Sequence, residues 1–293
     1  MRRFARLLFL VVSFSVAFAF AGAGKITVAV SWQPYATLVK MIGGPNVNVV
    51  TLLPPGADPH NFEPKPAVIK AFSLAQVYFT DGSGLDKIWL PRFLAANKDV
   101  KVIDISKYIE WMKSEHDGPG IHGHHHDGDE IDPHIWTSPY RVKFLAQNIY
   151  QALKQLDPEH EIFYMRQNHL AQDRLIALER KLNETVIGLP SDRRSFIVFH
   201  PSYGYLAKDF KLKQYAIEVN GKEPKPRDLA NLIKMGRKNG IKAVFVQPEF
   251  SKRAAETIAK DLGAVVVETD PLAADFIGNT EKFIEALKEA GKK

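Results

Sequence analysis

The sequence contains no cysteine among its 293 residues. Without cysteine the chain cannot form a disulfide framework, offer thiolate ligands to a metal, or carry a lipid anchor on an N-terminal Cys. A chain of this length does not need disulfides, because about 270 residues suffice for two domains that each bury a core. Any metal site must therefore use histidine and carboxylate side chains.

Long hydrophobic runs are also missing, apart from one near the start. The apolar stretch Leu7–Phe20 follows three arginines and precedes the small residues 21–24. A basic start, an apolar run and an A-x-A site (residues 19–21 or 21–23) are typical of a secretory signal peptide. The alternative, a membrane anchor, needs about 20 apolar residues, more than this run provides. We therefore predict a signal peptide at residues 1–21 and a soluble, extracytoplasmic mature chain.

The excess of positive charge belongs largely to that leader. The formal net charge is +6, and removal of the three leader arginines lowers it to +3. The remaining Lys and Arg residues are scattered among acidic residues, so a basic stripe for nucleic acid is not supported.

Short runs rich in β-branched residues alternate with helical segments through the whole chain. The expected strands are Lys25–Val30, Val47–Leu53, Gln76–Thr80 and Val100–Ile105, then Ser195–His200, Lys213–Glu218, Lys242–Gln247 and Ala264–Thr269. Runs such as IVF and VVV are apolar on both faces, as parallel strands covered by helices should be. The pattern predicts an α/β fold of two lobes, each with a four-stranded, mostly parallel sheet.

Two helices are expected between the lobes. Residues 139–156 carry apolar side chains at the spacing of one buried helix face. Asp157 and Pro158 are typical of a helix start, and this second helix can continue until Gly188. About 30 residues of helix span roughly 45 Å, enough to join two lobes. We therefore expect an N-terminal lobe at 22–157, a linker helix at 158–188 and a C-terminal lobe at 189–293.

The segment 113–130, KSEHDGPGIHGHHHDGDE, lacks any periodicity and should form a mobile loop. It holds five of the ten histidines, namely His116, His122, His124, His125 and His126. His160 and His169 lie on the long helix and are interpreted as surface or packing residues. His60, His134 and His200 remain, each in a polar turn just outside a predicted element.

Parallel α/β sheets bind ligands at the carboxyl ends of their strands. His60 and His200 follow predicted strands at such an end, as does Asp270, and His134 can reach the same crevice from its loop. A histidine after a strand is more often a hydrogen-bonded turn residue than a ligand. The spacing alone therefore leaves both roles open, because it has no short-range geometry to test.

Several short motifs resemble one known family along essentially the whole mature chain. These are DPHNFEP at 58–64, DGSGLD at 81–86, DPHIW at 132–136, FHPSYGYLAKDFKL at 199–212, FVQPE at 245–249 and TDPL at 269–272. Together they resemble the zinc- and manganese-binding solute receptors of metal-importing ABC transporters. The resemblance implies two α/β lobes joined by one long helix, which agrees with the pattern of elements above.

The same resemblance implies four metal ligands: His60 and His134 from the first lobe, His200 and Asp270 from the second. Two departures are visible, since Gln247 and Asp86 stand where relatives often carry Glu. We expect neither to touch a proposed ligand.

Three imidazoles and one carboxylate suit zinc in four-coordinate geometry. Manganese-type relatives commonly place Glu at the position of His200, so a third histidine favours zinc, although iron, cobalt or nickel would also fit. Because imidazoles must be deprotonated to bind, zinc affinity should fall as the pH drops through the ordinary histidine range, near about 6.5. The histidine-rich loop is either an auxiliary zinc collector or an inert insertion.

The predicted function is an extracytoplasmic, monomeric zinc receptor that delivers the ion to an ABC permease. A secreted zinc hydrolase is the rival, with Glu63 as the nearest general base, but four protein ligands leave no open position for water. A metal buffer or adhesion protein is a further alternative. Asp58 and Asp132 form Asx turns or orient the ligand rings, and Trp136, Tyr203 and Tyr205 are expected to pack the crevice wall.

Overall fold

The computed structural model describes residues 24–57, 59, 62–114, 131–218 and 224–293. The predicted signal peptide, the five histidines of the loop, Asp58 and His60 therefore lie outside the described residues. Within these ranges, none of the helices has the length and hydrophobicity that crossing a membrane would require.

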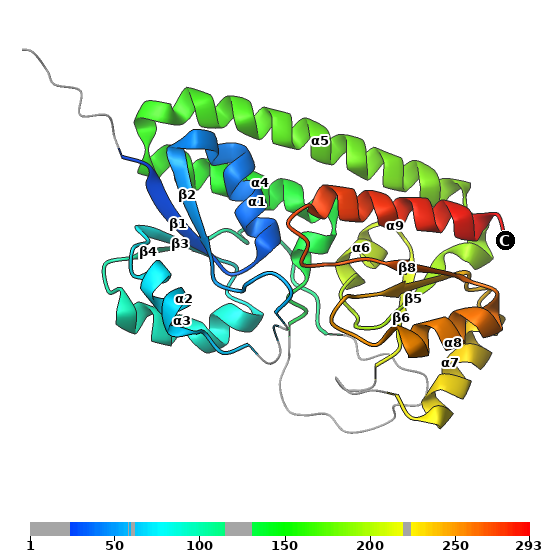
Figure 1. The fold of residues 1–293 in the computed structure, drawn as a ribbon. Helices are drawn as coiled ribbons and strands as arrows, with labels where there is room; N and C mark the ends of the chain where they lie inside the picture. Colours follow the sequence, from blue (N-terminus) through cyan, green and yellow to red (C-terminus); the bar gives the residue numbers. More distant parts are fainter. Residues whose placement is uncertain (1–23, 58, 60–61, 115–130, 219–223) are drawn as a thin grey trace, which may run out of the picture.

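Two four-stranded sheets form the centres of the two lobes (Figure 1). The first contains β1 (Ile26–Val30), β2 (Val47–Thr51), β3 (Val77–Thr80) and β4 (Lys101–Asp104) in the order β2-β1-β3-β4. The second contains β5 (Ser195–Val198), β6 (Lys213–Ala216), β7 (Ala243–Val246) and β8 (Val265–Glu268) in the order β6-β5-β7-β8. Every pairing is parallel. The predicted fold class is confirmed, and each strand lies inside its predicted range.

Helices cover both sheets and connect them. They are α1 (Gln33–Gly43), α2 (Pro66–Phe72), α3 (Gly84–Ala96), α4 (Pro139–Leu156), α5 (Glu161–Gly188), α6 (Gly204–Asp209), α7 (Pro226–Lys238), α8 (Lys252–Leu262) and α9 (Phe276–Gly291). Short 3₁₀ turns lie at η1 (Gly44–Asn46), η3 (Ile135–Thr137), η4 (Pro158–His160) and η5 (Ser191–Arg193). The helical crossovers explain why neighbouring strands run parallel.

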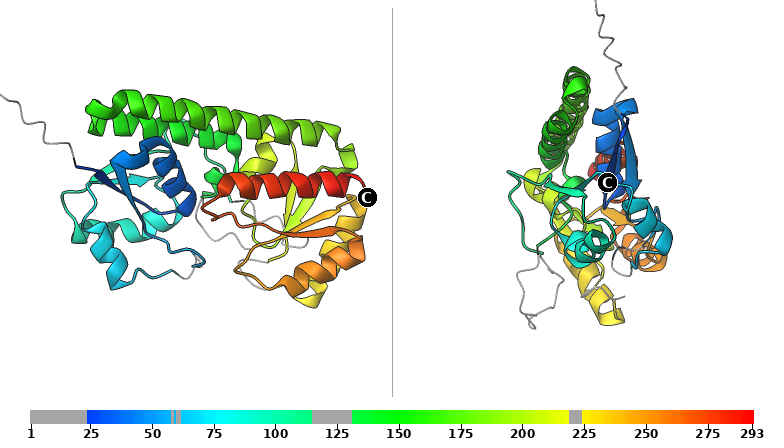
Figure 2. Two further views of the ribbon diagram at one scale, coloured as in Figure 1. Left: turned by 45° about the horizontal axis from the view of Figure 1, so that its top comes forward. Right: turned by 90° about the vertical axis from the view of Figure 1, so that its left-hand side faces the viewer.

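The two long helices lie side by side, and α5 extends along both lobes (Figures 1 and 2). Helix α4 has the predicted bounds. Helix α5 has 28 residues, which corresponds to roughly 42 Å. It begins at Glu161 and not at Pro158 as predicted, because the Asp157 carboxylate accepts from Tyr164 Oη at 2.6 Å and pairs with His160 Nδ1 at 2.7 Å. Residues 158–160 form a 3₁₀ turn beneath that carboxylate.

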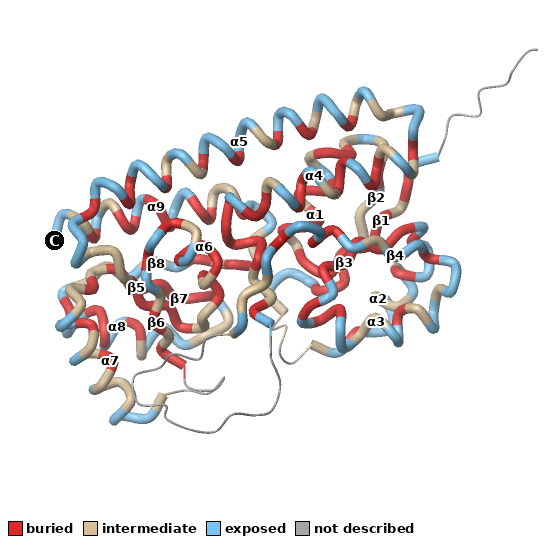
Figure 3. Tube along the Cα trace, turned by 180° about the vertical axis from the view of Figure 1, so that it is seen from behind, coloured by how far each residue is buried: buried red, intermediate tan, exposed pale blue. Residues whose placement is uncertain are grey.

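Buried residues recur along the inner face of α4 and α5, whereas the outer face of α5 is largely exposed (Figure 3). The apolar residues of α1, α4 and the start of α5 pack on the first sheet, and α5 continues onto the second sheet through Leu178, Leu182 and Val186. One expectation was wrong: the VVV run of β8 is not covered on both faces. Val266 is 38% exposed because β8 is the edge strand of its sheet.

The carboxyl ends of the strands of both lobes face a shared cavity of about 1000 Å³. Ser83 after β3, His200 after β5 and Gln247 after β7 all line it. The cavity lies where the family of parallel α/β folds usually binds ligands.

Candidate metal site

His134 lies in a turn of the first lobe that Asp132 organises. Asp132 Oδ1 accepts a hydrogen bond from the backbone N of His134 at 2.9 Å and contacts His134 Nδ1 at 2.7 Å. Because a carboxylate only accepts, the ring donates its Nδ1–H, which in the neutral imidazole leaves the lone pair on Nε2. Asp132 therefore plays both roles that the sequence left open: it forms the turn and it orients the ring.

His200 follows β5 and is oriented by a carboxylate of the neighbouring strand. Its Nδ1 contacts Glu218 Oε1 at 2.9 Å. Sequence reasoning missed Glu218, although a signal existed: Glu218, like His200, is the last residue of a predicted strand. In the structure Val198 pairs with Ala216 in parallel register, so residues 200 and 218 lie equally far past their strands. The ring also stacks near Phe250, with centroids 6.0 Å apart.

Gln247 holds the backbone of His200, which contradicts the expectation that it touches no proposed ligand. Gln247 Oε1 accepts from the backbone N of His200 at 3.2 Å, and its Nε2 donates to the His200 carbonyl at 2.7 Å. The same Nε2 donates to Ser202 Oγ at 3.0 Å. The residue follows β7, the strand beside β5, so its side chain bridges two strand ends.

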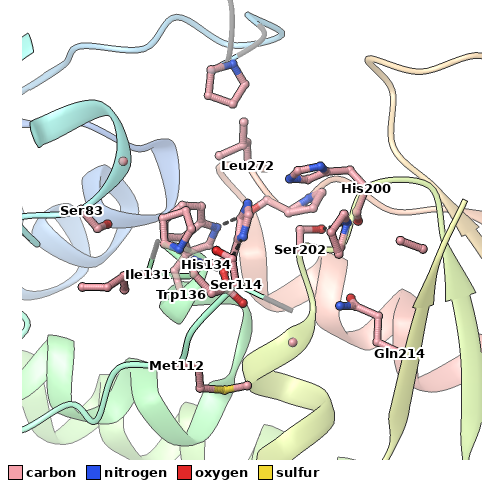
Figure 4. Close-up of a pocket in the computed structure, with 18 of the residues that line it drawn as sticks. Ser83, Met112, Ser114, Ile131, His134, Trp136, His200, Ser202, Gln214 and Leu272 are labelled. Carbon is pink, nitrogen blue, oxygen red and sulfur yellow. Dashed lines mark hydrogen bonds and ion pairs between the residues drawn. The ribbon is translucent and has the colours of Figure 1, made fainter. Parts of the chain in front are cut away.

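The two rings meet across the crevice between the lobes (Figure 4). The centroids of the His134 and His200 rings are 5.2 Å apart, at an interplanar angle of 69°. Their side chains are 13% and 15% exposed, and Nε2 of His200 is itself shielded from solvent. Two imidazoles bound through Nε2 to one tetrahedral ion, with Zn–N bonds of about 2.0–2.1 Å, would have centroids roughly 5 Å apart.

Asp270 lies in a turn just beyond β8. Its backbone N donates to Asn279 Oδ1, and its Oδ1 accepts from the backbone N of Leu272, both at 2.8 Å. Burial raises the pKa of this carboxyl, and the Leu272 hydrogen bond opposes that shift. Trp136 Nε1 donates to the Pro271 carbonyl at 2.8 Å, which ties this turn to the His134 turn.

The structure brings only part of the proposed ligand set together. Pro271 and Leu272 line the cavity, but Asp270 is not among the described residues that do so. In the ranges that the structure describes, no three His, Asp or Glu side chains lie close enough to enclose a metal ion. His60 lies outside those ranges, so the set of four stays a prediction.

Two tryptophans, Trp32 and Trp136, line the crevice on the first-lobe side. The Trp32 and Trp136 rings lie 4.8 Å apart. Trp136 lines the cavity as expected, whereas Tyr203 and Tyr205 are buried and are not among the described residues that line it.

Two buried carboxyls, Asp81 and Asp86, lie in the first lobe below the strand ends. Tyr35 Oη donates to Asp81 at 2.6 Å, and Thr80 Oγ1 donates to Asp86 at 2.5 Å. Burial, reinforced by the nearby Asp86, raises the pKa of Asp81 to about 7. Burial also raises the pKa of Asp86, against the hydrogen bonds that it accepts from Ser31 and Thr80.

Two lobes around a crevice, with one oriented imidazole from each, define the class of two-lobed solute-binding receptors. The sequence model of the family "zinc-uptake complex component A, periplasmic" (ZnuA) matches residues 28–290, and the chain therefore belongs to that family. Members of this family are periplasmic metal-binding receptors and not enzymes.

Three relatives show how far the sequence likeness extends. A Treponema pallidum (strain Nichols) protein to which metal binding is ascribed is 30% identical over 249 residues, covering 83% of this chain and 78% of that protein. The zinc-binding lipoprotein AdcA of Streptococcus pneumoniae serotype 4 (strain ATCC BAA-334 / TIGR4) is 28% identical over 287 residues, covering 91% of this chain. This chain spans only 56% of the length of AdcA. The manganese-binding lipoprotein MntA of Halalkalibacterium halodurans is 25% identical, covering 90% of this chain and 85% of that protein.

Solved structures agree with the fold. The crystal structure of ZnuA superposes with a TM-score of 0.79 at 37% identity, covering 91% of this chain and 98% of that one. A ZnuA variant lacking residues 138–173 of its own chain, with zinc bound, gives a TM-score of 0.80 at 36% identity and the same coverage.

Proposed function

We propose that this chain captures zinc with His60, His134, His200 and Asp270 and delivers it to the permease of an ABC importer. The observation that carries the proposal is the pair of oriented rings, 5.2 Å apart, that approach each other from opposite lobes. Each ring has its Nδ1 held by a carboxylate, which leaves Nε2 as the metal-binding atom. The zinc-bound relatives in the same family support the choice of cargo.

Zinc is favoured over manganese by the donor atoms. Imidazole nitrogen suits zinc, whereas manganese prefers oxygen ligands. Both described histidines are also oriented to offer nitrogen, and replacing His200 by Glu would move the set toward oxygen. Because one relative binds manganese, the native metal has to be tested directly.

A hydrolase is disfavoured by the surroundings of its only suggested base. Glu63 has a side chain that is 77% exposed and pairs with Arg92 at 3.7 Å. It is therefore a solvated surface carboxylate, and it is not among the described residues that line the cavity. A general base must lie within hydrogen-bond reach of the reacting water.

The test is zinc affinity of the chain without residues 1–21, measured by competition with a fluorescent chelator. We expect His134→Ala and His200→Ala each to weaken zinc binding at least about 100-fold, because each removes an inner ligand. His160→Ala is the matched control, since His160 also pairs with an aspartate but lies at the start of α5. Wild-type affinity in both crevice variants would contradict the proposal.

The native cargo is tested by elemental analysis after loading from equimolar Zn, Mn, Fe and Ni. We expect zinc in the wild-type chain and a larger manganese fraction in His200→Glu. Manganese in both proteins would favour the manganese-receptor alternative.

The proposal extends to the leader, the oligomeric state and the histidine-rich segment. We propose that the signal peptide is cleaved after Ala21, which mass spectrometry of the exported chain tests, and that the mature chain is a monomer, which light scattering tests. Residues 113–130 would collect zinc weakly. Lys113 and Ile131 pair as an antiparallel bridge across the base of this segment, so replacing residues 114–130 by a two-residue Asn-Gly turn should be tolerated. Unchanged zinc stoichiometry in that deletion would make the segment an inert insertion.

We further propose that the chain divides into lobes at 22–157 and 189–293, with 158–188 as the linker. The packing of α5 on both cores supports this division. Hydrogen exchange would contradict it if α5 exchanged as one unit with only one of the lobes.

A further inference from the structure

Helix α6 begins just after His200 and is bound to the first lobe by a buried ion pair. Arg141 of α4 donates from Nε to Asp209 Oδ2 at 2.8 Å and from Nη2 to Oδ1 at 2.9 Å. The two side chains are 6% and 11% exposed. Two parallel hydrogen bonds between a guanidinium and a carboxylate fix orientation as well as distance. The pair therefore holds α6 in one position against the first lobe.

Further contacts join the same helix to neighbouring first-lobe segments. Ser138 Oγ donates to Asp209 Oδ2 at 2.7 Å, and Arg141 also donates to the Glu110 carbonyl. The Arg141 guanidinium lies over the Tyr205 ring, 4.4 Å from its centroid. We call Ser138, Arg141, Tyr205 and Asp209 the interlobe clasp.

The clasp reaches the turn that carries His134. Tyr205 Oη donates to the Asp132 carbonyl at 2.8 Å and accepts from the backbone N of Met112 at 2.9 Å. At Gly204 a Cβ would lie only 2.8 Å from Asp132 Oδ2, so the α6 backbone lies directly against that carboxylate. Asp132 in turn holds both the backbone and the ring of His134.

One buried cluster is therefore connected to both histidines. On one side it leads through Asp132 to His134. On the other side it leads back along the chain from Gly204 to His200, whose backbone Gln247 fixes. A ligand pair drawn from two lobes keeps its spacing only if the lobes are held together near it.

We propose that the interlobe clasp sets the spacing of His134 and His200, which makes Arg141 and Asp209 positioning residues for the cargo ion. Neither residue binds the metal. The inference rests on the proposed function, because it concerns the geometry of that same site. It assigns a role to Tyr205 and Asp209 of the FHPSYGYLAKDFKL motif, whose His200 alone is a proposed ligand.

The proposal and a merely structural role predict different measurements. A structural pair lowers the stability of the free and the zinc-loaded protein alike, so the stabilisation by zinc is unchanged. A positioning pair also lowers zinc affinity, so the zinc-dependent rise in melting temperature shrinks as well. Cobalt bound in place of zinc reports the geometry directly, because its visible absorption depends on coordination.

The experiment uses two variants of the mature chain. Arg141→Lys keeps the positive charge but loses the two parallel N–H donors of the guanidinium. Asp209→Asn keeps the size of the side chain but removes its negative charge. We expect each to weaken zinc binding about tenfold, as removal of an outer support of a metal site does. Both should also shift the cobalt spectrum. Lys143→Met is the matched control, because Lys143 lies on the same helix but pairs with Glu179 of α5, at 2.5 Å.

Circular dichroism identifies variants that fail to fold. If Arg141→Lys does not fold, the proposal is judged on Asp209→Asn, the milder substitution. Wild-type zinc affinity and cobalt spectrum in a folded clasp variant would overturn the inference. If His134→Ala and His200→Ala also bound zinc with wild-type affinity, the proposed function would fail as well. If His134→Ala lost zinc binding while the clasp variants kept wild-type affinity, the proposed function would stand and only the role of the clasp would be rejected.

Discussion

The two lobes share one sheet topology but use their strand ends differently. In the second lobe the residue two positions beyond a strand has a titratable side chain in three cases: His200 after β5, Glu218 after β6 and Asp270 after β8. The equivalent first-lobe positions include Trp32 after β1 and Ser106 after β4. The second lobe therefore presents its candidate ligands directly from the sheet, while the first presents His134 from a separate turn.

The first residue after the third strand of each lobe shows the contrast most clearly. It is Asp81 after β3 and Gln247 after β7, 3% and 2% exposed. Asp81 accepts from Tyr35 and Ser83, whereas Gln247 both donates to and accepts from the backbone of His200. At this position the first lobe thus has an ionisable side chain, Asp81, and the second lobe has a neutral one, Gln247. The pH dependence of folding stability should consequently differ between these two positions.

The largest expected effect of this contrast is the response of Asp81→Asn to pH. The folded pKa of Asp81, about 7, lies above its ordinary value of 3.8, so the folded state keeps a proton that the unfolded state has lost. Stability from this group is complete at low pH and is lost as the pH rises toward about 7. At about 1.4 kcal/mol per pKa unit, the loss is at most roughly 4 kcal/mol.

Urea unfolding at pH 5 and pH 8 measures this effect. The free energy of unfolding of Asp81→Asn, taken as a difference from the wild type, should be more favourable at pH 8 than at pH 5. Asp173→Asn, on an exposed part of α5, is the control. A constant difference between Asp81→Asn and the wild type at both pH values would show that folding does not raise the pKa of Asp81 into this pH range.

The Gln247→Leu variant should give a smaller loss that does not depend on pH. It removes the partner of the His200 backbone N and carbonyl and of Ser202 Oγ. Leaving a buried polar group without its partner costs about 1–3 kcal/mol. Urea unfolding should show the same cost at pH 5 and pH 8, since no charge is removed. A cost that changed with pH would contradict the proposed difference between a titratable Asp81 in the first lobe and a neutral Gln247 in the second.

The sequence predicted elements more reliably than it predicted contacts between them. The β-branched runs identified every strand among the described residues, and the 3.6-residue apolar spacing placed both ends of α4, because those signals depend only on burial. The bonds from Gln247 to His200 and from Arg141 to Asp209 join residues far apart in the chain. The first contact depends on which strands are neighbours in the second sheet, and the second depends on how the lobes are placed. Local patterns contain neither.

The sequence predicted the candidate ligands better than it predicted the residues that hold those ligands in place. His134 and His200 were found from their turns, and the family resemblance connected them with His60 and Asp270. Glu218 was missed because its role depends on the register between β5 and β6. Asp132 was found, but whether it formed the turn or oriented the ring needed coordinates, and it does both.

The smallest expected effect concerns Glu218 and tests whether the second lobe orients its ligand as proposed. Glu218→Gln keeps an acceptor for His200 Nδ1 but removes the negative charge that makes the ring a better donor to metal. We expect zinc affinity to fall about tenfold, or about 1.4 kcal/mol, in chelator competition. Asp157→Asn is the matched control, because Asp157 pairs with His160 away from the crevice. Equal affinities in the two variants would mean that the Glu218 charge does not support the site. The second lobe would then contribute the position of His200 alone.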